Sequence, residues 1–388
     1  MKRFLCFLIC ILFLSGCSET SEPVPETLPE PSAEEILATA PPITETTFPP
    51  ETLPPDPVEE LMRSMSLEEW VGQLFLVGAD PSLAETHIRE YNLGGFLLFA
   101  ADFKNETPGD SAAKKIARWQ EAARVPLLIA TDEEGGTVTR VSCYAYYRDR
   151  RFASPRDLYS GGGMDAVLAE EAEKCALLAE LGVNVNLGPV CDITTDPDAF
   201  MYRRSLGEAA DTTAKFVSQM VQLKQQYFIG SSLKHFPGYG NNADTHTGIA
   251  RDSRSLEALE SCDLIPFQAG IDAGAGAIMV SHTIVEALDP ELPASLSPAV
   301  HRYLRETMGF EGVIVTDDLV MQAIADQYGA GEAAVMAVQA GNDLLCTSSF
   351  AEQYEAVLAA VLEGRIDFDT VKSAVRNVLE WKLQLQLL

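Results

Sequence analysis

Short apolar runs alternate along the chain with longer amphipathic stretches, from about residue 58 onward. The runs are almost continuously apolar, which is the pattern of strands that are covered on both faces. The predicted strands are, in chain order, Leu74–Gly78, Gly95–Phe99, Pro126–Thr131, Val183–Leu187, Ser231–His235, Ala277–His282, Val313–Asp317 and Asp343–Cys346. The stretches between them have helical periodicity. Strands that alternate with helices in this way predict a parallel sheet.

A single domain over residues 58–388 accounts for this alternation. A helix near its start is predicted at Ser66-Leu67-Glu68-Glu69, which has the form of a capping box. Further helices are predicted over Ala166–Leu181, Thr212–Gln226, Leu256–Ala273, Pro298–Met308 and Asp369–Leu385. Roughly eight strands in a domain of this size favour the α/β class, with a TIM-type (β/α)8 barrel rather than an open doubly wound sheet. No glycine-rich nucleotide motif follows a strand, so we expect no cofactor.

The first 17 residues have the pattern of a secretory signal peptide. Lys2 and Arg3 precede a short apolar run that ends at Ser15-Gly16-Cys17, and this run is too short to span a bilayer as a helix. Leu-Ser-Gly-Cys resembles the lipobox of bacterial lipoproteins, which implies lipidation of Cys17 and removal of the residues before it. Residues 18–57 hold about half of the 22 prolines and no Lys or Arg, and so predict a disordered, extended linker. We therefore expect an extracytoplasmic protein that is anchored to the cell membrane.

The chain is strongly acidic. Its 388 residues include 28 Lys and Arg against 57 Asp and Glu, which gives a formal net charge of −29. Such a surface repels the phosphates of nucleic acids and of anionic lipids, whereas a neutral sugar is indifferent to it. The eight cysteines are scattered without a C-x-x-C pair, which argues against a zinc site and against a disulfide framework. We expect a monomer with no metal and no nucleic-acid partner.

Polar residues stand at the ends of five predicted strands. The third strand runs into Asp132-Glu133-Glu134-Gly135-Gly136, and the fourth continues to Asp192. The fifth ends in Lys234-His235, the sixth in Ser281-His282 and the seventh in Asp317-Asp318. Each has a structural explanation when taken singly. Asp318, for example, could cap the next helix. Together they predict an active site, because barrel enzymes collect their catalytic groups at the C-terminal ends of the strands.

The loop after the fifth strand carries the most specific motif. It reads Leu233-Lys234-His235-Phe236-Pro237-Gly238-Tyr239-Gly240 and is followed by Asp244-Thr245-His246. This sequence resembles the lysine–histidine–phenylalanine–proline–glycine loop and the Asp-x-His dyad of glycoside hydrolase family 3, and in particular of its bacterial β-N-acetylhexosaminidases. The similarity runs through the whole barrel, from Ser66 to Asp343. The dyad is specific to the hexosaminidase branch, whereas some of the other motifs are shared more loosely across the family.

The resemblance implies a retaining mechanism, in which a nucleophile and a proton donor flank the anomeric carbon. Asp317 matches the nucleophile of the family, and Lys234 or Arg204 nearby would keep it ionised. His246 matches the acid/base, which in this branch replaces the usual carboxylic acid, and Asp244 would orient its ring. The implied enzyme is an exo-acting β-N-acetylhexosaminidase that removes a terminal β-linked N-acetylglucosamine.

The resemblance also implies a pocket whose polar groups pair with the hydroxyls of the terminal sugar. The implied substrate-binding residues are Asp132, Arg140, Arg204, Lys234, His235 and His282. The chain departs from the family at Thr137, at Tyr239 and near Ile249, where Arg, His and Pro are common. These departures remove no catalytic group, but they put the leaving-group side of the substrate in question.

Peptidoglycan fragments are the expected source of the sugar, and two alternatives stay open. The first is a β-N-acetylglucosaminide phosphorylase, because a histidine acid/base would not repel phosphate as a carboxylate would. An extracytoplasmic location argues against it, since a sugar phosphate is useful mainly inside the cell. The second is a sugar-binding lipoprotein on an inactive barrel, against which the intact Asp317, Asp244 and His246 argue.

Overall fold

The computed structural model describes residues 56–104, 111–240 and 250–388. The signal peptide, Cys17 and nearly all of the predicted linker lie outside these ranges, and so do Asp244, His246 and Ile249. The first described helix is α2 (Pro57–Arg63), whose N-cap is Asp56. The predicted capping box is confirmed one helix later, where Ser66 and Glu69 begin α3 (Leu67–Gln73).

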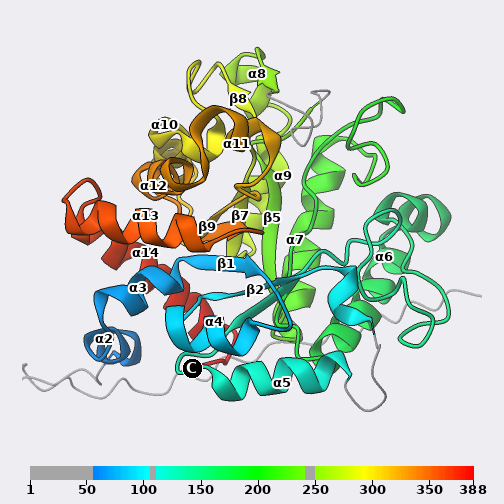
Figure 1. Cartoon of the computed structure of the whole chain (residues 1–388). Helices are drawn as coiled ribbons and strands as arrows, with labels where there is room; N and C mark the ends of the chain where they lie inside the picture. Colours follow the sequence, from blue (N-terminus) through cyan, green and yellow to red (C-terminus); the bar gives the residue numbers. More distant parts are fainter. Residues whose placement is uncertain (1–55, 105–110, 241–249) are drawn as a thin grey trace, which may run out of the picture. The chain divides into compact units, whose positions relative to one another are not determined.

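Eight parallel strands form the centre of the domain (Figure 1). They are β1 (Phe75–Gly78), β2 (Gly95–Leu98), β3 (Leu128–Thr131), β4 (Val185–Asn186), β5 (Gly230–Phe236), β7 (Ala277–Val280), β9 (Val313–Thr316) and β10 (Leu345–Thr347). Their neighbours follow the order β10-β1-β2-β3-β4-β5-β7-β9. The two ends of this order meet, because Asp343 N donates to Ile314 O at 2.8 Å and Thr316 N donates to Leu344 O at 3.1 Å. The sheet therefore curves round into a barrel, and the predicted TIM-type fold is confirmed.

Helices connect the strands and surround them (Figure 1). After α3 they are α4 (Ala84–Tyr91), α5 (Ala112–Ala122), α6 (Pro155–Glu180), α7 (Ala210–Gln226), α8 (Leu256–Glu260), α9 (Leu264–Asp272), α10 (Pro298–Arg302), α11 (Gln322–Tyr328), α12 (Ala330–Ala340), α13 (Ala351–Leu362) and α14 (Phe368–Gln384). A separate pair of short strands, β6 (Arg251–Asp252) and β8 (Ile284–Val285), lies outside the barrel sheet. Within the described ranges, no helix combines the length and the apolar character needed to cross a membrane.

Two predicted helices differ from the structure. The stretch Leu256–Ala273 is not one helix, because α8 ends at Glu260 and α9 begins at Leu264. Pro266 explains the break, since a residue without an N–H is tolerated in the first turn of a helix but not in its interior. The stretch Pro298–Met308 begins as α10 and continues as a turn of π-helix over Tyr303–Thr307.

The C-terminal helix α14 closes the N-terminal end of the barrel. Its Val378 and Trp381, together with Leu385 directly after it, belong to the same buried cluster as the barrel-lining Leu128. A Cβ atom at Gly276, directly before β7, would lie 2.0 Å from Trp381 Nε1, so a glycine is required for the indole to pack this closely. With this end filled by side chains, the C-terminal ends of the strands are left to form a cavity.

Candidate active site

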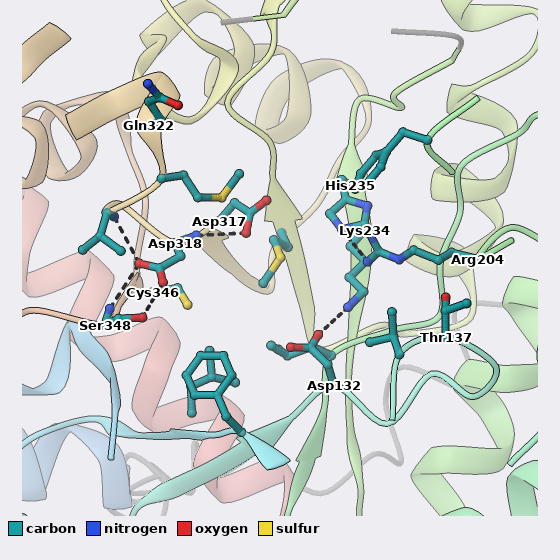
Figure 2. A pocket seen from close by; sticks show the side chains of 18 of the residues that line it. Asp132, Thr137, Arg204, Lys234, His235, Asp317, Asp318, Gln322, Cys346 and Ser348 are labelled. Atoms are coloured by element: carbon teal, nitrogen blue, oxygen red, sulfur yellow. Dashed lines mark hydrogen bonds and ion pairs between the residues drawn. The ribbon is translucent and has the colours of Figure 1, made fainter. Parts of the chain in front are cut away.

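A cavity of about 1050 Å³ opens at the C-terminal ends of the strands (Figure 2). Six of the predicted site residues within the described ranges line it: Asp132, Arg140, Arg204, Lys234, His235 and Asp317. They come from loops that are far apart in the sequence, and the closed sheet brings the ends of their strands together. The remaining lining includes Leu97, Leu187, Met279 and Cys346 from the strand ends, and Val320, Met321 and Gln322 beside α11.

Two carboxylates and two cations form one ionic network on the β3 and β5 side of the cavity. Lys234 Nζ lies 2.5 Å from Asp132 Oδ1 and 2.7 Å from Glu134 Oε1. Arg204 forms a two-pronged pair with the same Glu134, with Nε to Oε2 at 2.9 Å and Nη2 to Oε1 at 2.7 Å. The side chain of Glu134 is 4% exposed, whereas that of Asp132 is 17% exposed and faces the cavity. The network therefore presents fixed donors and a fixed acceptor to a polar ligand.

The charges of this network reinforce one another. Burial would raise the pKa of the Glu134 carboxyl, but Arg204 and Lys234 outweigh burial and hold that pKa well below its usual range. Burial would likewise lower the pKa of Lys234, but Asp132 and Glu134 raise it above its ordinary value. Glu134, Lys234 and Arg204 are thus charged at neutral pH, and their positions are fixed before a ligand arrives.

His235 is held from both ring nitrogens. Its Nδ1 lies 2.8 Å from Asp192 Oδ2, and because an ionised carboxylate can only accept, Nδ1 donates. Its Nε2 lies 3.2 Å from Arg204 Nη2, which can only donate, so Nε2 accepts. Asp192 Oδ1 also accepts from Tyr239 N at 2.7 Å, which ties the loop after β5 to the loop after β4. Asp192 and Arg204 therefore fix the orientation of the His235 ring in the wall of the cavity.

Arg140 reaches the cavity because Glu133 folds the loop that carries it. Glu133 is fully buried, and its Oε2 accepts from the backbone N of Arg140 at 2.6 Å and of Val141 at 2.7 Å. Its Oε1 accepts from Ser142 Oγ at 2.5 Å. Asn186 at the end of β4 holds Glu133 in turn, since its side-chain amide accepts from Glu133 N and donates to Glu133 O. Arg140 Nη2 then lies 4.0 Å from Asp132 Oδ2.

Asp317 and Asp318 lie on the β9 side of the cavity, across from the network (Figure 2). Asp317 N donates to Val280 O at 3.0 Å, and Asp317 Oδ1 accepts from Asp318 N at 2.9 Å. Asp318 Oδ2 accepts from Ser348 Oγ at 2.5 Å, and its Oδ1 accepts from the backbone N of Ser348 and of Val320, both at 3.1 Å. Asp318 thus joins the loops after β9 and β10 and does not cap α11, whose N-cap is Met321.

The prediction that His282 lines the pocket is wrong. His282 is fully buried and is not among the residues that line the cavity. Its Nδ1 lies 2.7 Å from Ser295 Oγ, and its Nε2 lies 3.0 Å from Asp318 O. The β7 residue that faces the cavity is Met279, and His282 lies beyond the strand end, behind the chain that carries Asp317 and Asp318. It supports that backbone from within the protein.

The other sequence predictions for the site have mixed outcomes. Thr137 lines the cavity, whereas Tyr239 is buried with its ring 5.6 Å from that of Phe200. Asp244 and His246 are untested, and so is the predicted effect of Lys234 or Arg204 on the ionisation of Asp317. Glu134 was missed as a site residue, although its place in the polar run after β3 was a signal for it. Among the described residues, no group of three or more His, Cys, Asp or Glu side chains could hold a metal ion.

Comparison with known proteins agrees with this arrangement. The glycosyl hydrolase family 3 N terminal domain matches residues 66–381. A β-hexosaminidase of Xanthomonas campestris pv. campestris is 32% identical over 277 residues, which are 70% of this chain and 82% of that enzyme. Beta-hexosaminidase A of Pseudoalteromonas piscicida is 30% identical over 337 residues, which are 79% of this chain and 55% of that protein. The chain therefore spans little more than half of this longer relative.

Solved structures show the same barrel. A glycoside hydrolase family 3 β-N-acetylglucosaminidase from Paenibacillus sp. str. FPU-7 superposes with a TM-score of 0.77 at 32% identity, over 83% of this chain and 63% of that one. A β-N-acetylhexosaminidase from Beutenbergia cavernae superposes with a TM-score of 0.72 at 28% identity, over 82% of this chain and 98% of that one. The second comparison indicates that a chain of barrel size alone can carry the fold.

Proposed function

Because the chain belongs to glycosyl hydrolase family 3, we propose that it is a retaining, exo-acting β-N-acetylhexosaminidase that releases terminal β-linked N-acetylglucosamine. One observation carries the proposal: Asp317 lines the same cavity as Asp132, Lys234 and Arg204 of the network, on the opposite side (Figure 2). A carboxylate that faces a cluster of hydroxyl-binding groups is the arrangement that a retaining glycosidase needs.

The proposed reaction has two steps. In the first, a carboxylate oxygen of Asp317 attacks the anomeric carbon while His246 donates a proton to the departing glycosidic oxygen. In the second, His246 takes a proton from water, the water oxygen attacks the anomeric carbon, and the bond to Asp317 breaks. Asp244, two residues before His246, would orient the imidazole and stabilise its protonated form. The roles of His246 and Asp244 are supported by the motif in the sequence.

The network on the β3 and β5 side suits recognition of the sugar. Asp132 is the acceptor that reaches the cavity, and Lys234 and Arg204 are donors whose places are set by Glu134. A site that is built to pair hydroxyls rejects analogues that lack them, because its buried groups would be left without partners. We propose that this network holds the hydroxyls of the terminal sugar, and that Arg140 contributes from the next loop.

The leaving group and the cell location are further parts of the proposal. The cavity is as large as those that bury a drug-sized ligand, so it leaves room beyond a single sugar ring. We propose peptidoglycan fragments as the natural source, reached from a membrane anchor at Cys17. Support comes from the lipobox-like sequence and from the spacer-like composition of residues 18–57. Incubation with purified muropeptides and with chitobiose, with released N-acetylglucosamine as the readout, compares the two sources directly.

Turnover of a nitrophenyl β-N-acetylglucosaminide by the purified protein tests the central claim. Asp317→Asn is expected to lower kcat by about a thousandfold or more, because the amide cannot form the glycosyl-enzyme. Asp318→Asn is the matched control, since this neighbouring carboxylate is bound to Ser348, and it is expected to lose far less. Near-normal turnover by Asp317→Asn would remove Asp317 from the nucleophile role. Assays with and without phosphate identify the product, and a sugar 1-phosphate would mean phosphorolysis.

A further inference from the structure

Three charged side chains are buried directly behind the sugar-binding network. They are Glu171 and Lys174 on α6 and Lys224 on α7, and each side chain is 6% exposed or less. Lys174 Nζ lies 2.7 Å from Glu171 Oε2, and Lys224 Nζ lies 3.8 Å from Glu171 Oε1. We call this group the rear cluster. It contributes two cations and one carboxylate to the interior, none of which lines the main cavity.

The rear cluster holds the backbone at the ends of β3 and β4. Lys174 Nζ donates to the backbone O of Glu134 at 3.1 Å. Lys224 Nζ donates to the backbone O of Asn186 at 3.2 Å and of Gly188 at 2.8 Å. Asn186 is the residue that clamps the backbone of Glu133. The rear cluster therefore holds the backbone of Glu134 directly through Lys174, and it holds the residue that clamps Glu133 through Lys224.

A small second cavity joins the rear cluster to the network. It has a volume of about 20 Å³, and Glu134 and Arg204 line it together with Glu171, Lys174 and Lys224. A cavity of this size has room for about one water molecule. The network and the rear cluster thus share this small cavity, and they are also joined directly by the hydrogen bond from Lys174 Nζ to Glu134 O.

Stability alone is a poor explanation for the rear cluster. Desolvation of buried ions costs as much free energy as their attraction returns, so apolar side chains of similar volume often give equal or greater stability. The groups that the rear cluster touches are instead the backbone atoms on which the site geometry depends. We propose that Lys174, held by Glu171, positions Glu134 and through it Lys234 and Arg204, and thereby sets the affinity of the site for the terminal sugar.

The order of the strands in the barrel indicates which kinetic constant should change when the rear cluster is altered. β9, which ends directly before Asp317, lies opposite β3 in the closed ring of strands, so the rear cluster acts on the sugar-binding side. Weaker binding of ground state and transition state alike raises KM and leaves kcat unchanged. A merely structural role would instead reduce the fraction of active protein, which lowers the apparent kcat and leaves KM unchanged. The inference rests on the proposed function, because it concerns the same site.

The test compares Lys174→Met and Lys174→Arg with wild type, using the nitrophenyl β-N-acetylglucosaminide. Lys174→Met is expected to raise KM about tenfold with kcat within about threefold. Lys174→Arg keeps a charged donor and is expected to recover part of this loss. Lys382→Met is the matched control, because Lys382 is an equally buried lysine on α14, at the closed end of the barrel. Its KM and kcat are expected to equal those of wild type.

The possible outcomes separate the two proposals. No turnover by wild type would contradict the proposed function, whatever the variants do. An active wild type with an unchanged KM in Lys174→Met, or with a loss confined to kcat, would overturn the positioning role. If Lys174→Met fails to fold, the double variant Glu171→Gln/Lys174→Met removes both charges together and takes its place. A wild-type KM in the folded double variant would overturn the positioning role equally, and a raised KM would support it.

Discussion

Three adjacent acidic residues after β3 have three different functions. Asp132 faces the cavity, Glu133 is turned away from it and folds the loop of Arg140, and Glu134 pairs with Lys234 and Arg204. The sequence identifies the run as part of a site, because polar residues at a strand end of a barrel are exposed to the cavity. The sequence cannot show which of the three residues has which function, because each function depends on partners at least seven residues away in the chain. The closest of these are backbone groups of residues 140–142, whereas Lys234 comes from β5 and Arg204 from the loop after β4.

Glu134 offers a prediction at the scale of one residue. Its pKa is lower in the folded than in the unfolded protein, whose value is near 4.5, so it stabilises the fold above about pH 4.5. This contribution is lost as the pH falls towards the lower folded-state value. Glu134→Gln leaves two buried cations underpaired and is expected to cost about 3–5 kcal/mol at pH 7. Denaturant unfolding from pH 7 down to pH 3 should show the two proteins converging below pH 4.5.

The control for this change is Glu173→Gln. Glu173 also pairs with an arginine, Arg148, but its side chain is 55% exposed. Exposed ion pairs contribute about 0–1 kcal/mol, so this variant should unfold almost as wild type does. Equal losses in Glu134→Gln and Glu173→Gln would contradict the importance assigned to burial.

The prediction that His282 lines the cavity failed because the sequence does not show where a strand ends. His282 was placed at the end of the sixth predicted strand, Ala277–His282, but the direction of its side chain depends on where β7 ends. The strand ends at Val280, and the two residues beyond it turn the histidine towards Ser295 and the backbone of Asp318. A count of residues along a strand predicts side-chain direction only as far as the strand continues.

At the scale of elements, the sequence predicts the barrel strands well and the helices less well. Each of the eight predicted strands overlaps a strand of the barrel sheet, because a strand covered on both faces is a compact apolar run. Helix boundaries depend on single residues, and Pro266 divides the predicted Leu256–Ala273 into two helices. The sequence did not predict that α14 closes the N-terminal end of the barrel. Its apolar face shows that it packs against something, but only the closed barrel shows that it packs against strand ends around Gly276.

Lys382 on α14 gives a prediction about the stability of this element. It is fully buried, its Nζ donates to Gln73 Oε1 at 2.6 Å, and burial lowers its pKa to about 7. The unfolded protein therefore binds more protons than the folded one between about pH 7 and the ordinary lysine value of 10.5, so the contribution of Lys382 to stability improves as the pH rises. Lys382→Met should remove the cost of burying an amine.

The measurement is the free energy of unfolding of both proteins between pH 7 and pH 10. Lys382→Met is expected to be more stable at pH 7 by about 1–3 kcal/mol, because relief from amine burial exceeds the cost of an unpaired Gln73. The advantage should shrink steadily as the pH rises. A difference that is constant over this range would show that Lys382 does not titrate between its folded and unfolded states there.

At the scale of the whole molecule, charge and the proposed lipid anchor bear on the same question. The net charge of −29 gives the protein no general attraction to an anionic membrane surface. Attachment would therefore depend on covalent lipid, and two or more acyl chains on one residue are needed for stable anchoring. The sequence predicts the place of that lipid at Cys17, which lies outside the residues that the structure describes.

Replacement of Cys17 tests this prediction in a bacterial host that processes lipoproteins. The wild-type protein is expected to take up labelled palmitate and to sediment with membranes, because its acyl chains would be buried in lipid. Cys17→Ser lacks the thiol that receives the lipid and is expected to lose the label completely. Cys143→Ser is the matched control, since Cys143 is a half-buried free thiol of the barrel domain, and it should keep the label. An unlabelled wild-type protein, or equal labelling of Cys17→Ser, would show that the chain is not anchored through this residue.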